Sequence, residues 1–132
     1  MRKMILGAMV IGLLLGLGCA KAPHLRPGYE APEKTADSYH EALRWQDYEA
    51  ARKYVLPEAL PAFDQFVEQM TGNLTVADYT IGDAEIGDEG YSARVKVKRI
   101  YTLAPSATQR QDDLIQTWKL IDGKWLLAGP PF

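Results

Sequence analysis

The pair Asp122-Gly123 constrains the fold more than any other sequence feature, because it separates two segments in which large apolar residues alternate with other residues. Asp-Gly is a preferred pair for a two-residue type I′ hairpin turn, in which both residues have positive φ angles. Such a turn places Ile121 opposite Lys124, Leu120 opposite Trp125 and Trp118 opposite Leu127. One face of the hairpin then collects Leu114, Trp118, Leu120, Trp125 and Leu127. The sequence therefore predicts an antiparallel sheet with one buried face.

A second hairpin is predicted upstream of the first. From Tyr91 to Leu103, apolar residues fall at every second position except position 99. Arg94, Lys96 and Lys98 lie between them, and this is the period of a half-buried strand. The segment Gly87–Gly90 is typical of a hairpin loop. We expect a tight loop, with Ile86 opposite Tyr91, Ala84 opposite Ala93 and Asp83 opposite Arg94.

Arg99 falls on the apolar row of this strand, between Val97 and Tyr101. A guanidinium buried in that row needs a carboxylate or a bound anion as its partner. A β-bulge at Arg99-Ile100 would instead turn Arg99 outward, and bulges are common in long curved strands. The bulge is the interpretation that we prefer from the sequence.

Helices are predicted before the sheet. Apolar or bulky residues recur at helical spacing from Ala36 to Leu43, and Asp47 is placed to cap a second helix over 48–54 after a break at Trp45-Gln46. A third helix begins near Pro61, after an approach turn, and ends at Gly72-Asn73. Its predicted apolar face consists of Leu60, Phe63, Val67 and Met70.

The amino terminus has the three parts of an export signal. Arg2 and Lys3 precede an apolar run from Met4 to Leu17, and Gly18 stands before Cys19, the only cysteine. This segment resembles a bacterial lipoprotein signal, although Gly16 stands where that signal usually has leucine. The resemblance implies cleavage before Cys19, a diacylglycerol on its sulfur and an acyl chain on the new amine. An uncleaved membrane anchor and a plain secretory signal are the alternatives.

The predicted organisation follows from this signal. Residues 1–18 form the signal peptide, residues 19–34 the lipidated cysteine and a proline-rich flexible tether, and residues 35–132 a single domain. The expected location is the bacterial cell envelope, with a lipid anchor, and the outer membrane facing the periplasm is preferred over the inner membrane. Membrane attachment would run through the lipid on Cys19.

Composition excludes several classes of protein. The chain has 132 residues, of which 47% are hydrophobic and 24% charged, and this fits one globular domain. Removing residues 1–18 takes away Arg2 and Lys3 and no acidic residue, so the formal net charge falls from −2 to −4. An acidic chain of this kind argues against nucleic-acid binding. Two histidines and one cysteine, without a ligand motif, predict no metal site, and no cofactor is expected.

Two or three helices followed by about four antiparallel strands define an α+β fold. The chain is similar to the nuclear-transport-factor-two-like superfamily, also called ketosteroid-isomerase-like or SnoaL-like, in Tyr39–Leu43, Asp47-Tyr48, Ala50-Ala51 and the hairpin Trp118–Trp125. A cystatin-like sheet is the alternative. The resemblance implies a curved, cone-like sheet around a helix, with an interior that can hold a small hydrophobic ligand. Enzymes of that superfamily place an aspartate base and acidic or tyrosine donors there, but no such set maps onto this sequence.

The candidate ligand-binding residues are Tyr39, His40, Arg99, Tyr101 and Trp118, and Arg99 can take part only if no bulge turns it outward. His40 could act as a base, but a core-edge histidine bonded to the backbone is the preferred interpretation. We therefore predict a non-catalytic module that binds a small hydrophobic molecule or an envelope protein, and the sequence leaves a homodimer open. The alternative is an isomerase or dehydratase that uses His40 or an aspartate such as Asp78.

Overall fold

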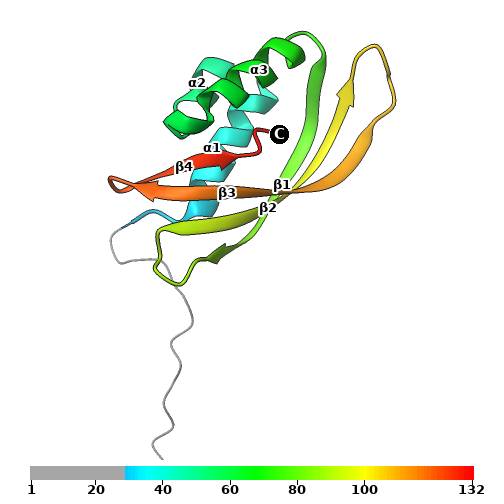
Figure 1. Cartoon of the computed structure of the whole chain (residues 1–132). Helices are drawn as coiled ribbons and strands as arrows, with labels where there is room; N and C mark the ends of the chain where they lie inside the picture. Colours follow the sequence, from blue (N-terminus) through cyan, green and yellow to red (C-terminus); the bar gives the residue numbers. More distant parts are fainter. Residues whose placement is uncertain (1–28) are drawn as a thin grey trace, which may run out of the picture.

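The computed structural model describes residues 29–132 as three helices packed on one face of a curved, four-stranded antiparallel sheet (Figure 1). The helices are α1 (Pro32–Arg44), α2 (Tyr48–Arg52) and α3 (Leu60–Met70), with a 3-10 turn η1 (Pro57–Ala59) before α3. The strands are β1 (Leu74–Ile86), β2 (Ser92–Leu103), β3 (Arg110–Ile121) and β4 (Lys124–Gly129), in the order β1-β2-β3-β4. The predicted α+β architecture is confirmed. The predicted signal peptide, Cys19 and most of the tether lie outside the described residues.

Helix α1 begins at Pro32, four residues before Ala36, where the helical spacing starts, so residues 32–34 of the expected tether form its first turn. A proline fits the first position of a helix because the amide that it lacks would have no partner there. Two contacts hold the start of α1 and the residues before it against the sheet. The backbone N–H of Ala84 donates to the Glu33 carboxylate at 2.8 Å, and the indole N–H of Trp125 donates to the carbonyl oxygen of Glu30 at 2.8 Å.

The predicted break between the first two helices is confirmed. Gln46 has a φ of 58°, and the Asp47 carboxylate accepts a hydrogen bond from the backbone N–H of Ala50 at 3.0 Å, as an N-cap does. Helix α2 ends at Arg52, two residues before the predicted end at Tyr54. A turn at Lys53-Tyr54 follows, and Val55 then forms a parallel bridge with Leu127 of β4, which bonds to Leu56 and to Tyr54.

The β3–β4 hairpin has the predicted turn and register. Asp122 and Gly123 have φ angles of 50° and 78°, and Ile121, Leu120 and Trp118 lie opposite Lys124, Trp125 and Leu127. The buried face includes Trp118, Leu120, Trp125 and Leu127, whereas Leu114 is only half-buried. This face, the helices and the buried residues of β1 and β2 form the core together.

The predicted register of the β1–β2 hairpin is wrong by two residues. Ile86 pairs with Ala93 and Glu85 pairs with Arg94, and a longer loop leaves Tyr91 48% exposed. The loop is closed by bonds from Gly87 to Ser92 and from Gly90 to Gly87, with Gly90 at a φ of 80°. A shift of two residues preserves the faces of both strands, so an acidic residue still lies opposite a basic one on the outer face.

No helix within residues 29–132 is long and apolar enough to cross a membrane.

Candidate functional site

The five predicted ligand-binding residues all lie inside the fold, and each is at most 8% exposed. Tyr39 and His40 come from α1, and the Tyr39 ring meets the rings of His40 and Trp118 edge-on, at centroid distances of 5.1 and 5.8 Å. Arg99 and Tyr101 are neighbours on β2, with the Arg99 guanidinium carbon 5.1 Å from the centre of the Tyr101 ring. The interior placement of Arg99 differs from the outward orientation preferred from the sequence, and a role of the five residues in ligand binding stays a prediction.

His40 bonds to a side chain rather than to the backbone partner expected from the sequence. Its Nε2 atom lies 2.8 Å from Oε1 of Gln116, and the amide nitrogen of Gln116 donates in turn to the carbonyl oxygen of Pro130 at 2.9 Å. This orientation of Gln116 requires a proton on Nε2. Burial, opposed by the bond to Gln116, lowers the pKa of His40 to about 4. His40 is therefore neutral at neutral pH.

Arg99 points into the core, and the predicted bulge at Arg99-Ile100 is wrong. The β2–β3 pairing continues through this position, with Arg99 opposite Asp112 and Ile100 opposite Gln111, and the irregularities lie in β1 instead. Continuous pairing is favoured because Asp112 supplies the partner that a buried guanidinium needs. Its Oδ1 atom lies 2.8 Å from Nε and 2.6 Å from Nη2 of Arg99.

Tyr101 completes this group, because its hydroxyl donates to Oδ2 of Asp112 at 3.0 Å. Burial, followed by this bond, raises the pKa of Tyr101. Three buried donors have no acceptor in the part of the chain that the structure describes, namely Nη1 of Arg99, Nε1 of Trp118 and the hydroxyl of Tyr48. Asp112 and Gln116 were not predicted from the sequence as members of this group. Their alternation with Leu114 and Trp118 on one strand is the signal that could have placed them on the same face.

The last four residues, Gly129–Phe132, close this interior, and the end of the chain lies between the helices and the sheet (Figure 1). The Tyr39 hydroxyl donates to the carbonyl oxygen of Pro131 at 2.6 Å. The Phe132 ring lies over Arg99, with 4.2 Å between the guanidinium carbon and the ring centre. It also stacks on Phe66 at 5.9 Å. Burial raises the pKa of Tyr39.

Asp78 does not lie inside the cone, so the alternative that used it as an interior base is wrong. Its side chain is 62% exposed, 4.0 Å from Arg44, and it accepts from the backbone N–H of Tyr79. The Tyr79 hydroxyl lies between the carboxylates of Asp37 and Glu41, at 2.8 and 3.0 Å. Burial, followed by these two bonds, raises the pKa of Tyr79.

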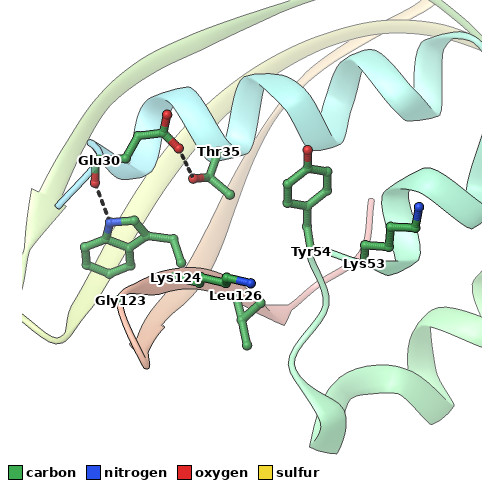
Figure 2. Close-up of a pocket in the computed structure, with 8 residues that line it drawn as sticks. Glu30, Thr35, Lys53, Tyr54, Gly123, Lys124 and Leu126 are labelled. Carbon is green, nitrogen blue, oxygen red and sulfur yellow. Dashed lines mark hydrogen bonds between the residues drawn. The ribbon is translucent and has the colours of Figure 1, made fainter.

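Two pockets are lined by other residues. Figure 2 shows a pocket of about 310 Å³ between the start of α1, the end of α2 and the β3–β4 hairpin, lined by Glu30, Thr35, Lys53, Tyr54, Gly123, Lys124, Trp125 and Leu126. A second, apolar pocket of about 230 Å³ lies between α3 and the last residues of the chain, lined by Val55, Ala59, Ala62, Phe63 and Leu127–Pro131. Residues 29–132 contain no group of three acidic, histidine or cysteine side chains that could hold a metal ion.

Solved structures with a similar arrangement are found at low sequence identity. A SEC-C motif containing protein from Rhodopseudomonas palustris matches with a TM-score of 0.62 and 13% identity over 75% of this chain and 76% of that one. An LEH-like epoxide hydrolase from M. tuberculosis matches with a TM-score of 0.56 and 11% identity over 75% and 78%. The chain therefore shares the α+β fold of these two proteins. At such identities the likeness shows the fold and no function.

A SnoaL-like polyketide cyclase from Mesorhizobium loti is also similar, with a TM-score of 0.46 and 15% identity over 70% of this chain and 91% of that one. No protein-family model matches the sequence, and no curated protein sequence matches it.

Proposed function

We propose that this protein is a lipid-anchored component of the bacterial cell envelope, whose cone-like domain binds a small, mainly apolar molecule without transforming it. The observation that carries the binding role is Nη1 of Arg99, a buried charged donor that lacks an acceptor among residues 29–132, as do Nε1 of Trp118 and the Tyr48 hydroxyl. Buried donors are nearly always bonded to protein, water or ligand, so this charged donor supports a bound partner. The apolar pocket beside Gly129–Pro131 supports a mainly apolar one.

A binding role is supported over acid–base catalysis by the state of the interior groups. A general base works best when its pKa lies near the working pH, whereas burial lowers that of His40 to about 4 and Gln116 holds its Nε2 proton. Asp112 is engaged by Arg99 and Tyr101 together. We therefore assign to His40 and Asp112 the role of orienting their partners Gln116, Arg99 and Tyr101. We assign no proton transfer to them.

Mass spectrometry of molecules that co-purify with the folded protein tests the binding role. Ala62 lines the apolar pocket from α3. The variant Ala62→Trp should fill that pocket and reduce the amount of bound molecule severalfold. Gln65→Trp is the matched control, because Gln65 is exposed on the same helix and does not line that pocket. Equal amounts in both variants, or no apolar molecule with the unaltered protein, would contradict the proposal.

The anchor has its own test, which does not depend on the ligand. Cells that express the full chain and receive labelled palmitate should label this protein through Cys19 and retain it in the membrane fraction, because several acyl chains hold a protein almost permanently. The Cys19→Ala variant should carry no label. Label that persists in that variant would exclude lipidation at Cys19.

A further inference from the structure

The Phe132 ring lies over the guanidinium of Arg99. Arg99 is 7% exposed, its guanidinium carbon lies 4.2 Å from the ring centre, and Phe132 itself is only half-buried. A guanidinium stacks favourably on an aromatic face at this distance. The ring therefore occupies a position for which a planar aromatic group is well suited.

The same guanidinium has an unused donor. Asp112 accepts from Nε and Nη2 through a single oxygen, and its other oxygen accepts from Tyr101, so Nη1 stays buried without an acceptor among the described residues. A buried donor left unpaired is destabilising, and a charged donor binds most strongly to an anionic acceptor. Phe132 supplies the ring that stacks on Arg99 and no acceptor for Nη1.

Few polar contacts hold the segment that carries Phe132, although its ring packs on Phe66 and Tyr101. Gly129 has a φ of 135°, a conformation that other residues rarely adopt, and Pro130 is exposed. Beyond Gly129, the polar contacts to the rest of the fold are the bonds from Gln116 to Pro130 and from Tyr39 to Pro131. The apolar pocket lies directly against Pro130 and Pro131, so this side of the segment is incompletely packed.

We propose that Gly129–Phe132 is a built-in occupant of the ligand site, and that the ligand is an aromatic molecule bearing an anionic group. The ligand displaces Phe132, its ring stacks on Arg99, and its anionic group accepts from Nη1. This inference rests on the proposed binding function for the existence of a ligand and adds its chemical class. Asp112 does not oppose the anion strongly, because 42% of its side chain is exposed and Arg99 pairs with it.

Calorimetric titration of the full chain in a non-ionic detergent tests this inference, with protein-free micelles as the blank. The probes are naphthalene-2-sulfonate and the uncharged naphthalene-2-methanol. Phe132→Ala should bind the sulfonate roughly tenfold more tightly than the unaltered protein, because the site no longer has to be emptied. The gain should be lost in Phe132→Ala/Arg99→Met and largely kept in Phe132→Ala/Arg99→Lys. Trp45→Ala is the control, since that ring is 72% exposed on the outside.

Three results separate the possibilities, with near-UV circular dichroism checking that each variant is folded. Preference for the sulfonate that depends on Phe132 and on a cation at position 99 supports the inference. Equal gains for both probes would overturn the anionic ligand class and leave the proposed apolar binding intact. Unchanged binding of both probes in folded Phe132→Ala would overturn the inference, because Gly129–Phe132 would then be a fixed part of the core.

Discussion

The carboxylate of Asp112 compensates the positive charge of Arg99, which is buried on the inner face of the sheet. Arg99 could be predicted to need a partner, because it falls on the apolar row between Val97 and Tyr101. The partner itself could not be predicted, because the β2–β3 register depends on where the strands end around loop 104–109, and that loop has no turn signal as specific as Asp-Gly. Gln116 and the closing residues Gly129–Phe132 could not be predicted either, because their contacts join segments that are far apart in the sequence.

Asp112→Ala should destabilise the fold, because it leaves the Arg99 charge buried without its partner. Removal of one member of a fully buried pair costs about 3–5 kcal/mol, and we expect about 2 kcal/mol here because the Asp112 side chain is 42% exposed. Asp113→Ala is the matched control, since that carboxylate pairs with Lys96 on the exposed face and its loss should cost less than about 1 kcal/mol. Urea denaturation measures both, and equal midpoints would mean that the Arg99 pair is not structural.

His40 should titrate near pH 4, which NMR of its ring protons measures, with His40→Gln used to assign the signal. Its pKa in the unfolded chain is about 6.5, so the unfolded state binds more protons between these values. The stability from the neutral, buried ring is fully present above about pH 6.5 and is lost progressively as the pH falls toward 4. The loss attributable to His40 is about 3 kcal/mol. A midpoint near 6.5 in the folded protein would contradict its burial.

At the scale of the elements, the β3–β4 hairpin and the β1–β2 hairpin show what a turn sequence can specify. Asp122-Gly123 allows one common two-residue turn, and the register that it predicts is found. Gly87–Gly90 is compatible with several loop lengths, so its register was wrong by two residues although the strand faces were right. The start of α1 was also missed, because a proline that marks a loop in one context begins a helix in another.

Trp125→Ala should lower the free energy of unfolding by about 3–5 kcal/mol, because the indole is 2% exposed and its N–H bonds to Glu30. Gly123→Val should also destabilise, since Gly123 has a φ of 78° and an added Cβ would lie 3.4 Å from the Tyr29 ring. Lys124→Ala is the control, because Lys124 is exposed beside the same turn. Urea denaturation gives all three values, and a Trp125→Ala midpoint equal to that of the unaltered protein would contradict the burial of this face.

At the scale of the whole molecule, the chain enters the domain at one end of the sheet. Tyr29 lies against the Asp122-Gly123 turn, and Glu30 is held by Trp125, so the β3–β4 hairpin is at this end (Figure 1). Loop 104–109 lies at the opposite end of the sheet. Tyr29 lies ten positions after Cys19, and a fully extended chain of ten Cα–Cα steps spans at most about 35 Å. A lipid on Cys19 would therefore hold the hairpin end near the membrane surface and leave the loop end farther from it.

This orientation can be measured, because Cys19 is the only native cysteine and its sulfur would be blocked by lipid. A fluorophore attached through Lys124→Cys should be quenched more strongly by lipids with a quencher on the headgroup than one attached through Thr108→Cys. Both positions are exposed, so either label should leave the fold intact, and circular dichroism checks this. The difference should disappear when Cys19 is also replaced by alanine and the protein leaves the membrane. Stronger quenching at position 108 would show that the domain is held by a surface other than the end where its chain begins.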